Sequence, residues 1–238
     1  MKVVILAGGK GSRLSEYTNK IPKPMVKIGN KPMIIHIINS FIRYGHKDFI
    51  IAGGYKSHLI KNYFQKKNNK IQNTRIRVIN TGLNALTALR IKKLEKFLKN
   101  ETFMLTYGDG ISNVNLKKLV SFHKKSKKTA TMTAVHPPAR FGELQFNNER
   151  IIKFEEKPQL QKGWINGGYF VLNSNIFEFL DKKNKMFERE VISELVKSKQ
   201  ICAFPHEGFW ACVDTKRDKD LLNDLVVRKK LKWLIKQD

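Results

Sequence analysis

The chain is poor in cysteine and has no long apolar segment. Cys202 and Cys212 form no Cys-x-x-Cys pair and have no neighbouring histidine, which argues against a disulfide or zinc site and favours two core thiols. No segment reaches the roughly 18 consecutive apolar residues that span a bilayer. The apolar run after Lys2 stops at Gly8, too short for a signal peptide. We therefore expect a cytoplasmic protein with no membrane partner.

Acidic residues are scarce as well. The 238 residues include 46 Lys and Arg but 20 Asp and Glu, which gives a formal net charge of +26. This charge would attract polyanions such as nucleic acid, anionic lipid or nucleotides, but its sign does not choose among them. Because much of the excess is lysine on presumed helix exteriors, we interpret it mainly as solvated surface and expect no nucleic-acid partner.

Strand-like and helix-like segments alternate in the first 135 residues. Extended segments are expected at residues 2–7, 48–52, 75–80, 102–106 and 129–135. Helical patterns lie between them, at residues 33–44, 57–67, 84–98 and 115–126. This alternation predicts an α/β fold in which a mainly parallel sheet is covered by helices on both faces, a Rossmann-like three-layer sandwich.

Shorter extended segments follow from Phe141 onward, with helices around Ile176 and Val191. The segments are 143–147, 151–155, 169–172, 201–204 and 209–213. They predict a mixed, partly antiparallel C-terminal extension of one domain that spans residues 1–238. Thr215, with Asp218 three residues later, is a good N-cap for a C-terminal helix. That helix is expected to carry Leu221, Leu222, Leu225, Leu231 and Leu234.

A glycine-rich turn, GGKGSRL at residues 8–14, follows the first predicted strand. Its glycines permit positive φ angles and close backbone approach, so consecutive N–H groups could converge on a phosphate beside the charges of Lys10, Arg13 and Lys23. The spacing matches neither a Walker loop nor the dinucleotide-binding fingerprint. The glycines alone would also suit a plain turn, but Lys23 between Pro22 and Pro24 favours an anion site.

Two aspartates follow predicted strands that lie far apart in the chain. Asp109 stands between Gly108 and Gly110, and Asp214 directly precedes the Thr215 cap. Magnesium prefers a few carboxylates together with phosphate oxygens and water. Each aspartate alone could serve its own turn or helix cap, but together with the anion loop the pair predicts a metal-bridged polyphosphate site.

Several motifs stand in order along nearly the whole chain. They are LAGGKGSRL (6–14), PKPM (22–25), GGY (53–55), YGDG (107–110), EKP (156–158) and NGGY (166–169). Together they resemble the sugar-phosphate nucleotidyltransferases. PPARFG (137–142), GWINGG (163–168) and GFW (208–210) before Asp214 are similar to those of the glucose-1-phosphate cytidylyltransferases within that family. The resemblance implies the nucleotide-diphospho-sugar transferase type of fold, with a nucleotide-binding half at 1–135 and a sugar-phosphate-binding half at 136–238.

The resemblance further implies a magnesium-dependent transfer of a nucleotidyl group from a nucleoside triphosphate to a sugar 1-phosphate, with CTP and glucose 1-phosphate favoured. The product would be a CDP-sugar for polysaccharide biosynthesis; UTP, dTTP, GTP and other sugars stay open. A sugar-phosphate oxygen would attack the α-phosphorus in line and release pyrophosphate, so catalysis would rest on alignment and charge stabilisation. This fits the absence of a Ser-His-Asp or Cys-His constellation among the dispersed histidines.

The resemblance also assigns roles to individual residues. The catalytic residues would be Arg13, Lys23 and Asp109, of which Arg13 would neutralise pyrophosphate and Lys23 would lie near the α-phosphate. Asp109 and Asp214 would hold Mg²⁺. The predicted nucleotide-binding residues are Leu6, Ala7, Gly8, Gly9, Gly11, Ser12, Thr87 and Arg90. The predicted sugar-phosphate-binding residues are Gly142, Glu156, Lys157, Asn166 and Gly167.

The chain departs from the cytidylyltransferase pattern in two places. Those enzymes usually have Met-Thr-Gly-Gly-Arg where this chain has Leu86-Thr87-Ala88-Leu89-Arg90. The sequence therefore does not decide which base the triphosphate carries. The stretch between Tyr63 and Thr81 is shorter than in those enzymes, so any subunit contact made there could differ. A homo-oligomer is therefore possible, but the resemblance does not imply it.

Two functions of other classes compete with this hypothesis. A basic protein that binds single-stranded nucleic acid would explain the charge, but it should interleave aromatic residues with cations on one face. Trp164 and Trp210 lie instead inside the matched motifs. A catalytically inactive regulatory relative is the second alternative. A dead copy has no physical reason to keep Arg13 and Lys23 together with both aspartates, which argues against it.

Overall fold

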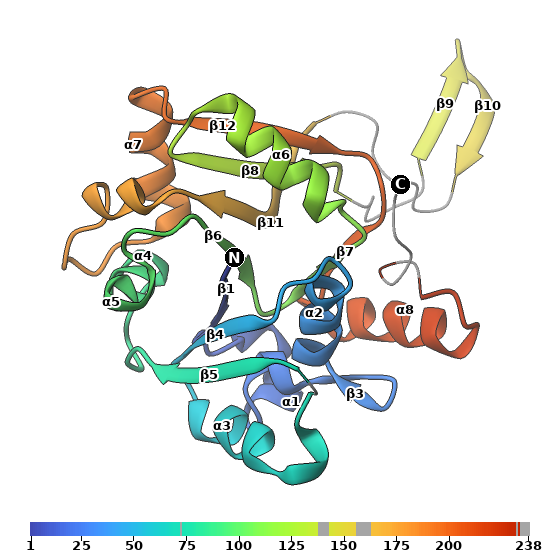
Figure 1. The fold of residues 1–238 in the computed structure, drawn as a ribbon. Coiled ribbons are helices and arrows are strands. Elements are labelled where there is room, and N and C mark those ends of the chain that lie inside the picture. The colour runs from blue at the N-terminus through green and yellow to red at the C-terminus, as the bar shows by residue number, and fades with distance from the viewer. Residues whose placement is uncertain (72, 138–142, 156–162, 232, 234–238) are drawn as a thin grey trace.

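The computed structural model describes residues 1–71, 73–137, 143–155, 163–231 and 233. A seven-stranded sheet runs through its centre, in the order β12-β8-β11-β6-β1-β4-β5 (Figure 1). Its strands are β1 (Val3–Ala7), β4 (Asp48–Gly53), β5 (Arg75–Asn80), β6 (Phe103–Tyr107), β8 (Ala130–Val135), β11 (Ile165–Leu172) and β12 (Ile201–His206). The predicted strands of the first half are all present.

Neighbouring strands are parallel except at β11, which runs antiparallel to both β6 and β8. The prediction of a mainly parallel sheet with a mixed second half is therefore confirmed. Residues 169–172 of β11 are at most 1% exposed, because the strand is covered on both faces. A continuous apolar run of this kind suits a central position in a sheet. The second half of the chain thus supplies two strands of the central sheet itself.

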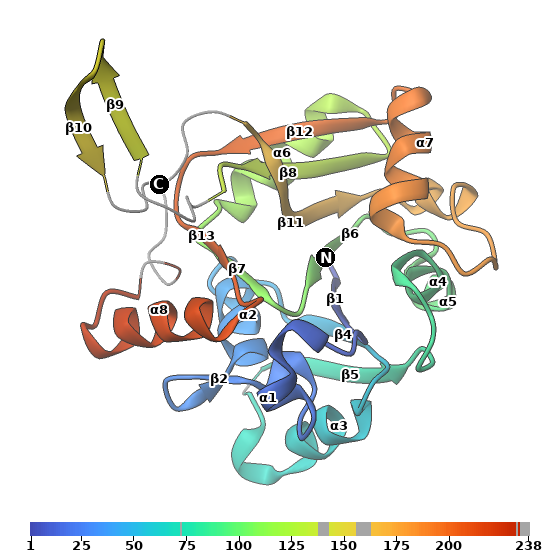
Figure 2. The same cartoon turned by 180° about the vertical axis from the view of Figure 1, so that it is seen from behind.

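Helices cover both faces of the sheet (Figures 1 and 2). They are α1 (Ser15–Thr18), α2 (Met33–Ile42), α3 (Ser57–Gln65), α4 (Thr87–Lys92), α5 (Glu95–Leu98), α6 (Leu116–Ser126), α7 (Ile192–Lys197) and α8 (Lys216–Val227). Phe41 of α2 and Leu119 of α6 belong to one apolar core, whereas Ile91 of α4 and Leu195 of α7 belong to another. These two cores confirm the three layers. No helix in the described ranges is long and apolar enough to cross a bilayer.

Two helices differ from their predicted bounds by more than two residues. The single helix predicted for residues 84–98 starts at Thr87, because Leu86 is extended and its N–H donates to Asn184 Oδ1 at 2.7 Å. It is divided into α4 and α5 near Leu94, whose N–H donates to Ile91 O at 2.9 Å, three residues back rather than four. The C-terminal helix begins at the predicted Thr215 cap, whose Oγ1 accepts from Asp218 N. It ends at Val227, since Lys229 adopts positive φ and Lys230 N donates to Leu225 O at 2.8 Å. Leu231 therefore lies beyond the helix, and Leu234 lies outside the described residues.

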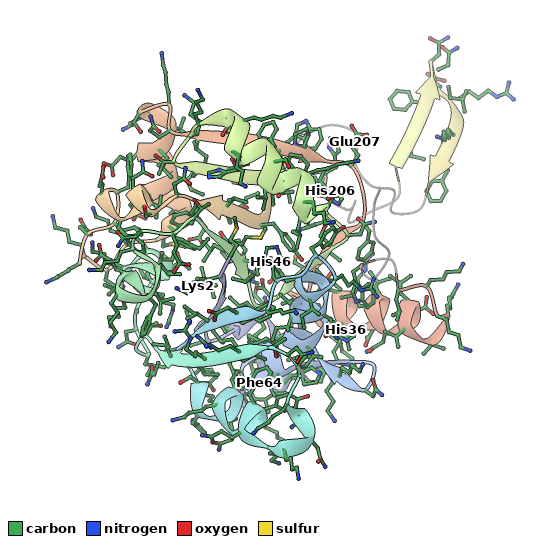
Figure 3. All side chains as sticks on the ribbon, in the orientation of Figure 1. Lys2, His36, His46, Phe64, His206 and Glu207 are labelled. Carbon is green, nitrogen blue, oxygen red and sulfur yellow. The ribbon has the colours of Figure 1, made fainter. Side chains whose placement is uncertain are left out.

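Three small two-stranded sheets accompany the central one. They pair β2 (Lys27–Ile28) with β3 (Lys31–Pro32), β7 (Gly110–Ser112) with β13 (Trp210–Cys212), and β9 (Glu143–Asn147) with β10 (Arg150–Glu155). The β9–β10 hairpin stands apart from the body (Figure 3). Phe146 and Phe154 on it are 70% and 60% exposed. Cys202 and Cys212 lie in β12 and β13 and are free thiols.

Short helical turns complete the described structure. The 3-10 helices are Ser12–Leu14, Lys23–Met25, Lys67–Asn69 and Ser174–Glu178, and a π-helix spans Phe187–Val191 directly before α7. The first two turns follow the carboxyl end of β1 and carry Arg13 and Lys23. The π-helix lies beside α4, which brings a segment of the second half against the first.

Candidate active site

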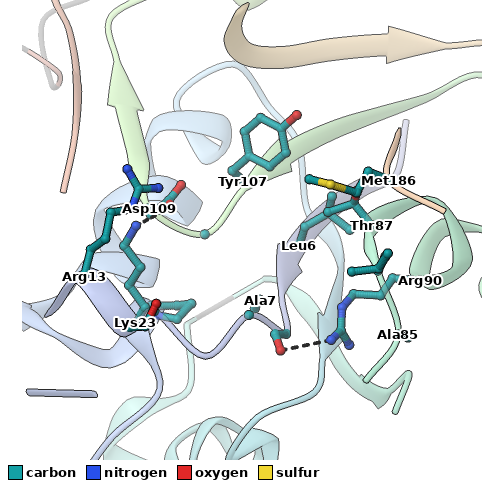
Figure 4. A pocket seen from close by; sticks show the side chains of 17 residues that line it. Leu6, Ala7, Arg13, Lys23, Ala85, Thr87, Arg90, Tyr107, Asp109 and Met186 are labelled. Atoms are coloured by element: carbon teal, nitrogen blue, oxygen red, sulfur yellow. Dashed lines mark hydrogen bonds and ion pairs between the residues drawn. The ribbon is translucent and has the colours of Figure 1, made fainter. Parts of the chain in front are cut away.

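The carboxyl ends of β1 and β6 lie side by side, with Leu6 paired to Tyr107, and border a cavity of about 340 Å³. Figure 4 shows this cavity between Arg13, Lys23 and Asp109 on one side and Thr87, Arg90 and Met186 on the other. All the predicted nucleotide-binding residues line it: Leu6, Ala7, Gly8, Gly9, Gly11, Ser12, Thr87 and Arg90. Their role in binding a nucleotide stays a prediction.

The glycine-rich loop presents its backbone to this cavity. Gly11 has a φ of 66°, a conformation that glycine adopts without strain. Among the described residues, the backbone N–H groups of Gly9, Lys10 and Gly11 have no hydrogen-bond acceptor. Unpaired N–H groups on an exposed turn, close to lysine and arginine side chains, provide the donors that phosphate oxygens require. The local structure therefore suits the anion loop that the sequence predicts.

Arg90 of α4 lies beneath this loop, and its guanidinium is bound to the protein itself. The residue is 4% exposed, and burial lowers the pKa of its guanidinium from the ordinary value. One nitrogen donates to Thr81 Oγ1 at 2.7 Å and Gly82 O at 2.8 Å, and the other donates to Gly8 O at 3.0 Å. Arg90 thus ties the loops after β1 and β5 together, so the structure shows it supporting the cavity wall with both terminal nitrogens already engaged.

Two glycines are needed because the Arg90 guanidinium approaches them closely. A Cβ atom at Gly8 would lie 2.1 Å from Arg90 Cζ, and one at Gly54 would lie 2.4 Å from Arg90 Nη1. A Cβ at Gly9 would meet nothing within 4 Å. Adjacent glycines of one motif therefore serve different purposes: Gly8 makes room for a side chain beneath the loop, whereas Gly9 leaves the cavity side open.

Lys23 joins the two aspartates that the sequence analysis paired. Its Nζ donates to Asp109 Oδ2 at 2.6 Å and to Asp214 Oδ1 at 2.7 Å. Arg13 Nη1 donates to Asp214 Oδ2 at 2.8 Å, although the Arg13 side chain is 71% exposed. The pairing of β7 with β13 brings Asp214 to this place, and Val213 N donates to Asp109 O at 2.9 Å. Two acids separated by more than a hundred residues therefore converge on one ammonium group.

The charged groups in this cluster shift one another's pKa values. Burial alone would lower the pKa of Lys23, but the charge and hydrogen bonds of Asp109 and Asp214 raise it above the ordinary value. Burial would raise the pKa of Asp214, but the hydrogen bond and charge of Lys23, with the charge of Arg13, hold it below its ordinary range. Burial and the Asp214 carboxylate raise the pKa of Cys212 to about 12, so this thiol stays protonated.

A second cavity of about 240 Å³ lies on the other side of Asp109. Tyr107, Asp109 and Arg13 border both cavities. The predicted sugar-phosphate residues Asn166 and Gly167 line the second one, whereas Gly142, Glu156 and Lys157 lie outside the described residues. The second cavity is also lined by Thr106, Gly110, Gly168, Trp210, Cys212 and Asp214.

Tyr107 forms part of the wall between the two cavities. Its hydroxyl accepts a hydrogen bond from Asn166 Nδ2 at 3.2 Å. Burial, then the nearby Glu188 carboxylate and its hydrogen bond, raise the pKa of Tyr107, so the phenol is neutral at physiological pH. Gly168 has a φ of 78°, and a Cβ there would lie 2.6 Å from Tyr107 Cδ2. The ring therefore packs against a backbone position that only glycine fits without strain.

Some residues around the cavities were not among the predicted site residues. Tyr107 and Trp210 stand inside motifs that carried the resemblance, so their position in the chain was a usable signal. Met186 lines the first cavity and Glu188 contacts its Thr87, but neither stands in any of the motifs. All the histidines lie in the described part of the chain, and none lines either cavity.

Two cavities that meet at a cluster of two cations and two carboxylates are suited to joining two phosphate-bearing molecules. The loop N–H groups, Arg13 and Lys23 can bind a chain of phosphates in the first cavity. The second cavity has the polar wall of Asn166 and the indole of Trp210, whose Nε1 donates to Gly167 O at 2.7 Å. Polar groups on a broad aromatic surface suit a hydroxylated ring.

Comparisons with known proteins agree with this geometry. Glucose-1-phosphate cytidylyltransferase of Salmonella typhimurium is 38% identical over 98% of this chain and 98% of its own length. A Bacillus subtilis protein named as a probable glucose-1-phosphate cytidylyltransferase is 40% identical over 90% of this chain and 92% of its own. The solved structure of HddC from Yersinia pseudotuberculosis, complexed with GMP-PN, covers 94% of this chain and 99% of its own at 24% identity, with a TM-score of 0.73.

The structural likeness to HddC confirms the predicted fold. The family model described as nucleotidyl transferase matches residues 2–222, which takes in every described site residue discussed above. The relatives match at high identity over almost the full length of both chains. The predicted enzyme class is confirmed: the chain belongs to the nucleotidyl transferase family.

Proposed function

We propose that the protein transfers a cytidylyl group from CTP to glucose 1-phosphate, giving CDP-glucose and pyrophosphate. The observation that carries this proposal is the meeting of two cavities at Asp109, with Lys23 and Arg13 at the junction. The names of the two relatives described above favour CTP and glucose 1-phosphate among the substrates of the family. A CDP-sugar is an activated donor that suits polysaccharide biosynthesis.

In the proposed reaction the chain aligns two anions and stabilises charge. The free N–H groups of Gly9 and Gly11 bind the triphosphate oxygens. Lys23 places a positive charge near the α-phosphorus, and the exposed Arg13 neutralises the departing pyrophosphate. A phosphate oxygen of the sugar 1-phosphate, bound in the second cavity, attacks the α-phosphorus while the bond to pyrophosphate breaks. Alignment of the two reactants and stabilisation of developing charge account for catalysis without a protein nucleophile.

Asp109 and Asp214 have the donor chemistry of a magnesium site. Both carboxylates already contact one cation, Lys23 Nζ, at 2.6 and 2.7 Å, so they are near enough to bind the same ion. No cluster of three or more His, Cys, Asp or Glu side chains suited to a metal exists in the described part of the chain. A site of two carboxylates completed by phosphate oxygens and water is the type that Mg²⁺ accepts. When bound there, Mg²⁺ would supply charge neutralisation for the phosphates.

The proposal is tested by measuring pyrophosphate release with CTP, UTP, dTTP, GTP and ATP, each combined with several sugar 1-phosphates and Mg²⁺. We expect the largest kcat/KM for CTP with glucose 1-phosphate. Lys23→Met should reduce that value by about 10²-fold or more, the effect of losing one charge partner of the transition state. Lys20→Met removes the same charge from an exposed neighbour and should leave the value almost unchanged.

A different result would point to another function. If no combination of triphosphate and sugar 1-phosphate gives pyrophosphate, the proposed reaction is wrong. Steeply salt-dependent binding of single-stranded RNA that nucleotides do not displace would then favour the nucleic-acid alternative. Turnover with another triphosphate or sugar would keep the reaction class and correct the substrates.

A further inference from the structure

The first cavity has two chemically different ends. One end carries Lys23, Asp109 and Arg13, next to the glycine-rich loop (Figure 4). The opposite end is lined mainly by apolar groups, from Leu6, Ala85, Leu86 and Met186, with the polar side chains of Thr87 and Arg90 among them. A nucleotide whose phosphates lie along the loop must place its heterocyclic base at the apolar end. Because the terminal nitrogens of Arg90 donate to protein oxygens, Thr87 is the polar side chain at this end that is best placed to meet the edge of the base.

The hydroxyl of Thr87 can act only as an acceptor toward any further partner. A hydroxyl has one proton to donate and two lone pairs to accept with. Thr87 Oγ1 donates its proton to Glu188 Oε2 at 2.5 Å, and it accepts from Phe187 N at 2.8 Å. An ionised carboxylate has no proton to offer in return, so the direction of the first bond is fixed. Thr87 Oγ1 therefore has one lone pair left, with which it can accept one more hydrogen bond.

Neighbouring donors are also engaged within the protein. Leu86 N donates to Asn184 Oδ1 at 2.7 Å, and Ala88 N donates to Lys185 O at 3.1 Å. Met186 N donates to Glu190 Oε2 at 2.9 Å. Both terminal nitrogens of the Arg90 guanidinium donate to oxygens of the protein. These donors are thus not available to the base. The group that remains at the apolar end is the acceptor of Thr87.

We propose that Glu188, by holding the proton of Thr87, makes this cavity select cytosine over uracil and thymine. The 4-amino group of cytosine can donate to the remaining lone pair of Thr87, whereas the 4-oxo group of uracil or thymine would bring two acceptors together. Thr87 is the specificity-determining residue, and Glu188 acts through it. This inference rests on the proposed nucleotidyl transfer and deepens it by naming what decides the base, in a segment where Thr87 is kept but its neighbours differ from the cytidylyltransferase pattern.

The test compares kcat/KM for CTP and UTP within each variant, because the ratio does not depend on the fraction of enzyme that is folded. In Glu188→Gln, the amide can donate to Thr87 Oγ1 and release the threonine proton toward the base. We expect the CTP to UTP ratio to fall by about tenfold or more, with the UTP value maintained or increased, as one favourable hydrogen bond is lost and one is gained. Thr87→Val should lower the CTP value alone, by about three- to tenfold.

Matched variants separate this effect from charge and from packing. Glu194→Gln removes the same charge from an exposed position on α7 and should leave the ratio unchanged. Thr87→Ser keeps the hydroxyl and should keep the preference for CTP. If a variant turns over too slowly, dissociation constants for CMP and UMP, measured by calorimetry, provide the same ratio without catalysis.

The possible outcomes distinguish the two proposals. A wild-type enzyme that transfers a nucleotidyl group with a preference for UTP or dTTP would overturn the role of Thr87 and leave the reaction class intact. A preference for CTP that survives both Glu188→Gln and Thr87→Val would overturn it as well. Absence of turnover with every triphosphate would instead count against the proposed function.

Discussion

Arg90 donates a hydrogen bond to the carbonyl of Gly8 at 3.0 Å, from a guanidinium that is almost completely buried. Tyr55 N donates to the same carbonyl at 3.1 Å. The start of the phosphate-binding loop is therefore held from below by a side chain and by the loop after β4. Arg90 has no acidic partner within the described ranges, so hydrogen bonds to carbonyl and hydroxyl oxygens compensate its buried charge. The contact with Gly8 therefore links the stability of the fold to the shape of the loop.

Arg90→Lys should lower the free energy of unfolding by about 2–4 kcal/mol. Lysine has no planar fork, so it cannot satisfy the several buried oxygens that the guanidinium reaches, and each unpaired group carries a cost. Urea denaturation would measure the change. Arg75→Lys, at an exposed position of β5, is the control and should have almost no effect. Equal stability of the Arg90 and Arg75 variants would contradict the supporting role.

Gly8→Ala and Gly9→Ala should differ in stability although the two positions are adjacent. The new methyl group at position 8 would overlap the Arg90 guanidinium, and overpacking of this kind costs about 1–3 kcal/mol. The methyl group at position 9 meets open space, so its effect on the free energy of unfolding should stay below about 0.5 kcal/mol. Thermal and urea unfolding of both variants would check this difference. The double variant with Arg90→Lys should be less destabilised than the sum of the single changes, because the shorter cation relieves the overlap.

Lys23→Met should lower stability most strongly at intermediate pH, by about 1–3 kcal/mol. The pKa of Asp214 is depressed in the folded protein, so its ion pair stabilises the fold above the ordinary carboxyl value of 3.8 and is lost as pH falls through the lower folded pKa. The pKa of Lys23 is raised, so its contribution is present below 10.5 and is lost as pH rises through the higher folded pKa. Urea titrations across this range would show the difference between wild type and variant shrinking at both extremes. A difference that does not vary with pH would count against the ion-pair explanation.

Asp109→Asn should reduce turnover by about 10²-fold or more at saturating Mg²⁺, because a neutral amide is a poor magnesium ligand and a transition-state charge partner is lost. Pyrophosphate release would measure the change, with Asp220→Asn on the exposed side of α8 as the control. The concentration of Mg²⁺ needed for half-maximal rate should rise in the Asp109 variant. Near-normal rates at low Mg²⁺ would remove Asp109 from the proposed metal site.

Trp210→Phe should act mainly on the sugar 1-phosphate. The substitution keeps an aromatic ring in the second cavity but removes the hydrogen bond from Nε1 to Gly167 O, which positions the strand beside Asn166. We expect KM for the sugar 1-phosphate to rise about three- to tenfold while KM for the triphosphate changes little. Steady-state kinetics with each substrate varied in turn would separate the two. A selective increase in KM for the triphosphate would contradict the assignment of the two cavities.

Much of the fold could be predicted because burial leaves a local pattern. Apolar runs such as 2–7 and 48–52 become β1 and β4, and Thr215 with Asp218 forms the capping box that their spacing predicts. The helix predicted for 84–98 ends at Leu98 as expected, but its start and the end of α8 could not be predicted in the same way. The start depends on the contact of Asn184 with Leu86, which joins residues about a hundred positions apart. The end of α8 depends on a turn in which Lys230 N donates to Leu225 O.

The amino-acid sequence by itself determined which local pieces exist: a strand that ends in a glycine loop, cations beside it, and two aspartates at strand ends. The tertiary structure alone decided that β11 lies between β6 and β8, that β13 pairs with β7, and that Glu188 reaches Thr87. The physical reason is that periodicity and turn chemistry depend on near neighbours in the chain. Strand order and long-range hydrogen bonds depend on how all the apolar faces are buried at once, and no single segment records that arrangement.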